Sequence, residues 1–504
     1  MVMNKKEKVI LTILDGFGIG ENNKFNNAIF AAQTPFFDQV LTNKKFAKLA
    51  ASEEAVGLPK NQFGNSELGH MTIGSGRTIL GINDIFNNII DSNQLNDFLL
   101  SKEWVQNIIN NQEVIHLCGM YSSGCVHSNL KHMNALIKFF ENHNKKIALY
   151  LISDGRDTPG QVFLNDVKLL LGNIKETTKI IAVSGRYYAM DRDNNWERTE
   201  SFYEAMIQES NKQTDVDVLQ YIKNEYNQNI DDEFIHPICF ANNKYQIKEN
   251  DSIIFTNYRA DRIRQIIQLF YKTEFNLKTK SNNVFGLCEY SHVGLKDLIL
   301  EKNEMNNLLG EILSKHGITQ LRIAETEKFA HVTFFFDGGK VVKYHNHDQI
   351  LVNSPSVATY NLQPEMSAQQ ITDKILENLD NYDFLVVNYA NADMVGHTGD
   401  FEATKKAIEF LDKQCATLYN NVVDKYNGTL LITSDHGNAD YMIDENGNIV
   451  KTHTIAKVPF IVLSNKYEIK SFEGSLQDIA PSILHIYGID IPKEMNGQNL
   501  IKSK

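Results

Sequence analysis

Cysteine is scarce in this sequence, and it never occurs in the spacing of a metal-thiolate site or a disulfide framework. Only five cysteines occur among 504 residues, and no Cys-x-x-Cys pair is present. A scattered, odd-numbered set excludes a disulfide-stapled secreted fold and a zinc-thiolate site, and it is typical of a reducing compartment. The five are Cys118, Cys125, Cys239, Cys288 and Cys415.

Long apolar runs are also absent. The N-terminal run from Val9 to Leu14 stops at Asp15, and it is shorter than the roughly 7–15 residues of a signal-peptide core. No stretch reaches the ~18 apolar residues that a membrane span requires. Together with the cysteine pattern, these absences predict a soluble, cytoplasmic protein with no membrane partner.

An excess of positive charge is missing as well. The chain carries 50 Lys and Arg against 62 Asp and Glu, a net charge of −12. General nucleic-acid binders need basic charge to displace counterions from phosphates, so no nucleic-acid partner is expected. An anionic small-molecule substrate must then be held by a local cluster of Arg and Lys.

Short apolar segments alternate with amphipathic ones, a pattern typical of the α/β class. Helices are therefore expected on both faces of a mostly parallel sheet, with helical stretches such as Ser367–Leu379 and Phe401–Tyr426. The predicted strands are Val9–Leu14, Val114–Leu117, Ile147–Ile152, Lys179–Val183, Ile253–Thr256, Gln320–Ile323, Val332–Phe336, Phe384–Asn388, Leu430–Thr433 and Pro459–Leu463.

The distribution of polar residues predicts the domain organisation. Asp, His and Ser follow the strands up to about residue 80 and again after about residue 305, whereas the middle section carries Arg and Lys. We therefore expect one domain, residues 1–80 with 305–504, to be interrupted by another, residues 81–304. Polar connections are expected near Gly81–Asp84 and Lys302–Asn307.

Six Asp and His residues at strand ends indicate a metal site, because ligands of open α/β sheets bind beyond the carboxyl ends of strands. Two of them, Asp393 and His397, are four apart and would face one point from a helix or tight turn. Any one of these residues taken alone is more simply explained as a helix cap or a solvated charge than as a metal ligand. Carboxylate and imidazole without thiolate suit Mn²⁺, Zn²⁺ or Fe²⁺. The set is Asp15, Asp393, His397, Asp435, His436 and His453.

A serine precedes a probable short helix in the segment Asn65-Ser66-Glu67-Leu68-Gly69-His70. Ser66 is placed as an N-cap or first-turn residue, where free N–H groups favour an anion. Taken alone, it is more simply a cap. Beside divalent metals, its hydroxyl could lose a proton and become a nucleophile.

The middle section contains several Arg-rich turns that favour an anion pocket, because the guanidinium fork binds carboxylate or phosphate bidentately. Arg259 and Arg262 are three apart and would share a helical face. A solvated pair is the usual explanation of that spacing, but several such turns in an acidic chain favour a pocket. Lys328 could add a cation. The candidate residues of the turns are His127, Arg156, Asp157, Arg186, Arg192, Arg259 and Arg262.

In this order, the motifs resemble those of the cofactor-independent phosphoglycerate mutases of the alkaline-phosphatase superfamily, from about residue 8 to residue 498. The Asp-His-Gly motif alone would mark only the superfamily, whereas the middle motifs single out the mutases. The motifs are Asp15-Gly16-Phe17-Gly18, Asn65-Ser66-Glu67-Leu68-Gly69-His70, Asp154-Gly155-Arg156-Asp157, Ser184-Gly185-Arg186-Tyr187-Tyr188-Ala189-Met190-Asp191-Arg192, Glu325-Thr326-Glu327-Lys328, Gln363-Pro364-Glu365-Met366-Ser367-Ala368 and Ser434-Asp435-His436-Gly437-Asn438.

The resemblance implies an alkaline-phosphatase-like α/β domain with two Mn²⁺ ions and an inserted α/β transferase domain, with the substrate in the cleft between them and the chain a monomer. One ion would be held by Asp393, His397 and His453. The other would be held by Asp15, Ser66, Asp435 and His436. The implied substrate-binding set is His127, Arg156, Asp157, Arg186, Arg192, Arg259, Arg262 and Lys328.

The implied activity is the glycolytic and gluconeogenic interconversion of 3-phosphoglycerate and 2-phosphoglycerate without 2,3-bisphosphoglycerate. The resemblance makes Ser66 the transiently phosphorylated residue. We expect Asp157 to be the general acid and base for the glycerate oxygens, and Lys328 to stabilise phosphoryl charge.

Some positions depart from the family's pattern. A common Gly-Gly-Val-His-Ser-His stretch reads Gly124-Cys125-Val126-His127-Ser128-Asn129 here, which retains His127 but changes the residues at Cys125 and Asn129. Where the family often has an acidic residue and an Arg, the chain has His347-Asp348-Gln349, so an ion pair is expected to be missing there.

Two alternatives remain. Another phosphotransferase of the superfamily, such as a phosphopentomutase-like enzyme, would keep Asp435 and His436 but has no reason to keep Arg156-Asp157 or the 186–192 stretch. A non-catalytic binding protein on the same scaffold would be expected to lose a ligand or the nucleophile, and every matched position is filled here.

Overall fold

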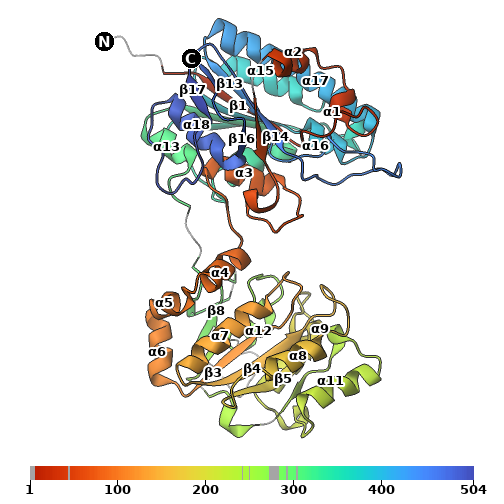
Figure 1. Ribbon diagram of the computed structural model, residues 1–504, viewed down its shortest axis with the longest axis vertical. Helices are drawn as coiled ribbons and strands as arrows, with labels where there is room; N and C mark the ends of the chain where they lie inside the picture. The colour runs from red at the N-terminus through yellow and green to blue at the C-terminus, as the bar shows by residue number, and fades with distance from the viewer. Residues whose placement is uncertain are drawn as a thin grey trace. The chain divides into compact units, whose positions relative to one another are not determined.

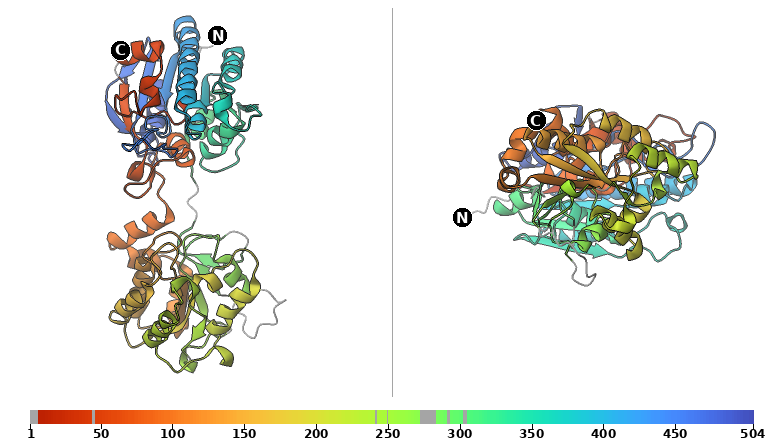
Figure 2. Two further views of the ribbon diagram at one scale, coloured as in Figure 1. Left: turned by 90° about the vertical axis from the view of Figure 1, so that its right-hand side faces the viewer. Right: turned by 90° about the horizontal axis from the view of Figure 1, so that it is seen from below.

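The computed structural model describes residues 6–43, 46–240, 242–248, 250–271, 283–290, 293–301 and 305–504. The chain divides into two compact units, Met1–Leu80 with Glu304–Lys504, and Gly81–Asn303 (Figures 1 and 2). Of the expected connection at Lys302–Asn307, the residues Lys302–Glu304 lie outside the described residues. In the part of the chain that is described, no helix has the length and apolar character needed to cross a membrane.

The first unit is built on an eight-stranded sheet that uses both chain segments. Five neighbouring strands, β11 to β13 in the spatial order, run parallel, and β14 is antiparallel to both of its neighbours. The spatial order is β11 (His347–Val352), β10 (Gln320–Glu325), β12 (Phe384–Tyr389), β1 (Val9–Leu14), β13 (Thr429–Thr433), β14 (Val458–Ser464), β2 (Phe46–Ala50) and β16 (Glu473–Ser475).

The central strands of this sheet are buried on both faces, which explains why they read as continuous apolar runs. Every residue of β1, β12 and β13 is buried. Alternate residues of β1 point to opposite faces: Leu11 belongs to one core cluster and Ile10 to the other. The first cluster includes α3 (Ser66–Ser75), α13 (Leu309–Lys315) and α18 (Ile479–Ile486); the second includes α2 (Pro35–Asn43), α15 (Ala368–Asn378) and α17 (Phe401–Tyr419).

The second unit has a seven-stranded sheet of its own, parallel except for one edge strand. Its helices include α7 (Leu130–Asn142), α8 (Phe163–Leu171) and α11 (Val218–Asn227) in one core cluster, and α10 (Trp196–Met206) and α12 (Arg264–Leu269) in the other. The spatial order is β6 (Ile238–Cys239), β5 (Thr178–Gly185), β4 (Lys146–Ser153), β3 (Val114–Met120), β7 (Ser252–Phe255), β8 (Val284–Gly286) and β9 (Asp297–Leu298).

The predicted α/β class is confirmed, and one predicted strand is wrong. The segment Val332–Phe336 forms a π-helical turn, His331–Phe335, directly after α14 (Thr326–Ala330). Val332 and Phe336 are buried four residues apart, whereas Phe334 between them is exposed. A short apolar run does not distinguish a buried strand from a buried helical turn, and here the spacing of buried residues is helical.

Candidate metal centre and anion-binding cluster

Ser66 is the first residue of α3 and lies in a buried polar centre of the first unit. The helix is capped by Asn65, whose Oδ1 accepts a hydrogen bond from the backbone N–H of Leu68 at 2.9 Å. The Ser66 Oγ lies 3.2 Å from Asp15 Oδ1 and 2.9 Å from His436 Nε2. The first-turn position predicted for Ser66 is therefore confirmed, and its hydroxyl faces carboxylate and imidazole.

Three buried carboxylates from different elements share this centre with one ammonium group. Asp15 follows β1, Asp393 lies in α16 (Asn391–Gly396) and Asp435 follows β13. Lys328 Nζ donates to Asp15 Oδ1 at 2.7 Å, to Asp393 Oδ2 at 2.8 Å and to Ser66 Oγ at 2.8 Å. Three carboxylates against one ammonium leave an excess of buried negative charge, which is costly unless a cation compensates it.

The pKa values reflect this charge imbalance. Burial, and then the charge of Asp435, raise the pKa of Asp15 to about 7. Although burial opposes it, Lys328 and then the histidines hold the pKa of Asp393 well below its usual range. Burial opposes the charged form of Lys328 too, yet Asp15 and Asp393 raise the pKa of its ammonium. Opposite charge thus maintains the ionised forms of Asp393 and Lys328, whereas burial and a like charge disfavour that of Asp15.

The histidines of the centre direct their Nε2 atoms inward. The Nδ1–H of His397 donates to Lys451 O at 2.7 Å, and that of His453 donates to Gly64 O at 2.8 Å. A backbone carbonyl only accepts, so each ring carries its proton on Nδ1 and keeps a lone pair on Nε2. The two Nε2 atoms lie 3.0 Å apart. Two facing lone pairs at this distance repel each other unless a cation or a proton lies between them.

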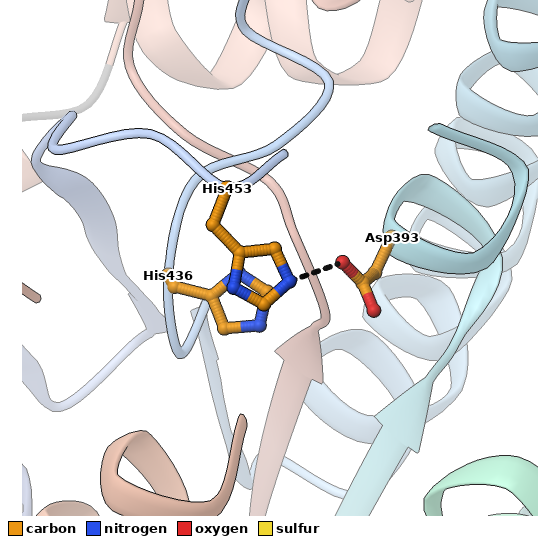
Figure 3. Close-up of side chains that lie close together, drawn as sticks. All are labelled: Asp393, His436 and His453. Atoms are coloured by element: carbon orange, nitrogen blue, oxygen red, sulfur yellow. Dashed lines mark ion pairs between the residues drawn. The ribbon is translucent and has the colours of Figure 1, made fainter. Parts of the chain in front are cut away.

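The ligand atoms gather into two groups, each within 4.8 Å: Asp393, His436 and His453 form one, and Asp15, Asp435 and His436 the other. Figure 3 shows the first group, with the His453 and His436 rings stacked and an ion pair from His453 to Asp393. His436 therefore takes part in both groups. His397 is in neither, although its Nε2 lies 3.1 Å from Asp393 Oδ1.

The residues present fit divalent ions. The donors are oxygen and imidazole nitrogen without thiolate, which suits Mn²⁺, Zn²⁺ or Fe²⁺. The buried Asp435 Oδ2 has no hydrogen-bond partner among the described residues. A buried carboxylate oxygen in this state is an unused ligand position, because native proteins rarely leave such an atom unsatisfied.

The second unit gathers its predicted residues around two turns that follow strands. Arg186 begins the short helix after β5, and its NH1 lies 2.7 Å from Asp154 Oδ1 and 2.5 Å from Asp157 Oδ2. His127 Nε2 lies 3.9 Å from Asp157 Oδ2, and its Nδ1 lies 3.5 Å from Asp261 Oδ1. Asp154 begins a quoted motif and Asp261 lies between the predicted Arg259 and Arg262, but neither aspartate was given a role from the sequence.

The remaining arginines complete a basic cluster. Arg192 NH1 lies 3.1 Å from Asp261 Oδ2, and Arg259 Nε lies 3.3 Å from Asp261 Oδ1, while Arg156 pairs with Glu233. Burial and then the charges of Arg192, Arg186 and Arg156 lower the pKa of Arg262. Like charges this close raise the local potential and favour a bound anion.

The predicted helical face for Arg259 and Arg262 is wrong. Both precede α12, which begins at Arg264, and Arg259 lies in the loop after β7. The backbone N–H groups of Tyr258 and Arg259 donate to His127 O, which holds this segment as a loop. The two arginines still belong to the same cluster, but the loop brings them there.

Comparisons with known proteins identify the family of the chain. The family model of the metalloenzyme superfamily matches residues 7–491. The 2,3-bisphosphoglycerate-independent phosphoglycerate mutase of Antithamnion sp. is 43% identical over 99% of this chain and 100% of its own length. That of Ehrlichia canis (strain Jake) is 43% identical over 98% of this chain and 99% of its own length.

A solved structure supports the same assignment. Leishmania mexicana phosphoglycerate mutase, crystallised at low cobalt concentration, is 25% identical and matches with a TM-score of 0.55 over 100% of this chain and 99% of that chain. The relatives are matched along their whole length, and the chain has a metal-type ligand set beside a buried serine. The chain therefore belongs to the 2,3-bisphosphoglycerate-independent phosphoglycerate mutases, within the metalloenzyme superfamily.

Proposed function

We propose that this chain interconverts 3-phosphoglycerate and 2-phosphoglycerate through a phosphoserine on Ser66, without 2,3-bisphosphoglycerate and with two divalent ions, for which we propose Mn²⁺. The single observation that carries the proposal is the surrounding of the Ser66 hydroxyl by Asp15, His436 and Lys328 at 2.8–3.2 Å. A hydroxyl in such surroundings is an activated nucleophile, since an unassisted serine is a poor one at neutral pH.

The proposed ligand sets are those implied by the resemblance. One ion would be held by Asp393, His397 and His453, and the other by Asp15, Ser66, Asp435 and His436. Bound there, such ions lower the pKa of a coordinated hydroxyl and neutralise charge on phosphoryl oxygens. The inward Nε2 lone pairs and the unused oxygen of Asp435 support these sets.

The chain's own groups supply the remaining chemistry. Lys328 Nζ donates to Ser66 Oγ at 2.8 Å, so its charge stabilises the developing alkoxide and then the phosphoryl group that is transferred to this oxygen. Ser66 attacks the substrate phosphate in line, and glycerate remains bound. The 2-hydroxyl of glycerate then attacks the phosphoserine. Two in-line displacements retain the configuration at phosphorus.

We assign the basic cluster of the second unit to the glycerate part of the substrate. Arg259 and Arg262 bind the carboxylate while glycerate re-orients, and His127, Arg156 and Arg192 complete the polar set. Asp157 moves protons to and from the glycerate oxygens. Its carboxylate is held by Arg186 NH1 at 2.5 Å, which fixes its position for proton transfer.

The direct test is conversion of 3-phosphoglycerate to 2-phosphoglycerate by the purified chain, coupled to a product-specific reporter and without 2,3-bisphosphoglycerate. Ribose 1-phosphate and ribose 5-phosphate serve as the comparison substrates. We expect turnover of phosphoglycerate alone. Turnover of the ribose phosphates instead would favour the phosphopentomutase-like alternative, and no turnover of either would favour a binding protein.

Substitution of Arg262 by methionine is expected to raise KM for 3-phosphoglycerate about 10- to 100-fold with a smaller change in kcat, because a charge-assisted contact to an anion is worth roughly 1.5–3 kcal/mol. Steady-state kinetics measure the change. The matched control is Lys146→Met, which removes a cation that pairs with Glu113 in the same unit. Equal KM values for the two variants would contradict the assignment of Arg262.

Activity is expected to fall on acidification, because protons compete with metal for the imidazoles. A hydrogen bond to Asp393 raises the pKa of His397, and Asp393 raises that of His453 although burial opposes it. Imidazolium cannot bind metal, so affinity is present above these raised pKa values and is lost as the pH falls through them, starting at or above about pH 6.5. A pH profile at two Mn²⁺ concentrations checks this. Excess Mn²⁺ should shift the acid limb to lower pH, and an unmoved limb would refute the explanation.

We also propose that the protein is a cytoplasmic monomer. The monomeric state rests on the family resemblance. The compartment is supported by the cysteines, all five of which are free, with Cys125 exposed. Light scattering during gel filtration measures the mass directly, and a mass of twice 57.4 kDa would contradict the monomer.

A further inference from the structure

Two fully buried polar side chains lie behind the proposed metal centre and have no role in the proposed mechanism. His70 is on α3, one turn after Ser66, and Asn388 is in β12. Both side chains are completely excluded from solvent. His70 ends a motif quoted from the sequence and Asn388 ends a predicted strand, but neither residue was given a role.

His70 contacts both the nucleophile's helix turn and one ligand carboxylate. Its Nδ1 lies 2.8 Å from Ser66 O and 3.3 Å from Asp435 Oδ2. The Ser66 carbonyl only accepts, so the ring carries its proton on Nδ1. Asp435 Oδ2 lies beside this N–H as a polar contact and not as its hydrogen-bond partner. Asp435 Oδ2 is the same oxygen that faces the metal centre, 3.5 Å from His436 Nε2.

The other side of the His70 ring is tied to the second carboxylate through Asn388. With its proton on Nδ1, His70 accepts at Nε2, and the Asn388 Nδ2 lies 3.1 Å away. The same Nδ2 donates its other hydrogen to Asp15 Oδ2 at 2.8 Å. The hydrogen bond from Asn388 thus engages Oδ2 of Asp15, and the other oxygen, Oδ1, faces Ser66 and Lys328.

The four groups form one continuous series, Asp435–His70–Asn388–Asp15. A polar contact of 3.3 Å joins the first two, and hydrogen bonds join the others. Its ends are the two carboxylates of one ligand group, and its middle is anchored to the backbone of the residue that carries the hydroxyl. Outer partners of this kind orient metal ligands, and their loss typically weakens metal affinity 10- to 100-fold.

We propose that His70 and Asn388 are positioning residues, which act as a unit to hold Asp15 and Asp435 at the spacing a divalent ion needs and to align Ser66 with it. The proposal rests on the proposed metal site. It assigns the pair no contact with the substrate. Its effect is therefore on metal affinity at one site and, through that site, on the reactivity of Ser66.

The test measures metal binding directly, so that it does not depend on turnover. Metal-stripped protein is titrated with Mn²⁺ by calorimetry, and thermal unfolding is recorded with and without the ion. The variants are His70→Leu, Asn388→Leu and the double variant. Two controls remove buried polar groups of the same unit elsewhere: His347→Leu, and Thr372→Val, which loses a hydrogen bond to Tyr389 OH.

We expect each single variant to weaken Mn²⁺ binding at one of two sites 10- to 100-fold, and the double variant to add little, since the two residues act through one series. Metal-free unfolding temperatures should fall no further than in the controls. The conservative His70→Asn keeps a donor near the position of Nδ1 and Asn388→Ser keeps one hydroxyl donor, so both should recover part of the affinity.

Two outcomes would overturn the proposal. One is full Mn²⁺ affinity at both sites in His70→Leu and Asn388→Leu. The other is a chain that fails to fold even as His70→Asn or Asn388→Ser, since this would make the pair structural. A wild-type chain that binds two Mn²⁺ ions but does not interconvert phosphoglycerates would contradict the proposed function and leave this inference standing.

Discussion

Replacement of Ser66 by alanine is expected to abolish interconversion of the two phosphoglycerates, a loss of at least about 10³-fold in kcat, because removal of a nucleophile eliminates the covalent route. The Ser66 hydroxyl contacts Asp15, His436 and Lys328. The coupled assay measures the loss. Circular dichroism should show an intact fold, since the substitution removes one oxygen atom from the start of a helix capped by Asn65.

The matched control is Ser75→Ala on the same helix, whose hydroxyl donates to the backbone carbonyls of Thr72 and Arg77. This variant should retain activity. A second measurement traps the intermediate: brief reaction with phosphate-labelled substrate, acid quench and peptide analysis should place the label on Ser66. If Ser66→Ala still interconverts the two phosphoglycerates, the covalent route is wrong.

Removal of metal is expected to have an effect of similar size. Dialysis against a chelator should lower activity to below about 1% of the starting value, since metal stabilisation of a transition state is worth several kcal/mol. Readdition of Mn²⁺ should restore activity. Elemental analysis of the restored protein should give two ions per chain, and the same analysis of Asp393→Asn should give one.

The structure also predicts a loss of stability in the stripped protein. Asp15, Asp393 and Asp435 are buried, and the ammonium of Lys328 pairs with Asp15 and Asp393. Because an ion that binds only the folded state stabilises it, unfolding temperature should rise with Mn²⁺ concentration. A chelated protein with unchanged activity and unchanged unfolding temperature would contradict the metal assignment.

The strands around the site were predictable from the sequence because they are buried on both faces. β1 is found at its predicted bounds, Val9–Leu14, and β12 and β13 differ by one residue at one end. The edge strand β11 and the short strand β2 were not predicted, because exposed residues interrupt their apolar pattern. Hydrophobic runs thus locate the centre of a sheet better than its edges.

The residue types of the metal centre could be predicted, but their grouping could not. Strand ends bring Asp15 and Asp435 to one edge of the sheet, whereas the sharing of His436 between two groups depends on distances that no spacing encodes. The same holds for the backbone carbonyls of Gly64 and Lys451, which orient His453 and His397. Every residue has a backbone carbonyl, so the sequence does not show which carbonyl will accept a hydrogen bond from a histidine.

The departures from the family pattern have structural counterparts. Cys125 has a φ of 53°, a left-handed conformation that glycine adopts at lower cost, at a position where the family commonly has glycine. Asn129 caps α7 by accepting from the N–H of Lys131. Gln349 is exposed on β11, and Asp348 accepts a hydrogen bond from Tyr382 OH at 2.7 Å.

The position of β1 at the centre of its sheet affects how the chain folds as the ribosome makes it. β1 pairs with β12 and β13, whose residues follow those of the whole second unit. At ~5–20 residues per second, the interval between synthesis of β1 and of its last partner is on the order of 20–80 s. The second unit, continuous in sequence, can fold during this wait, while the apolar first strand stays unpaired and open to chaperones.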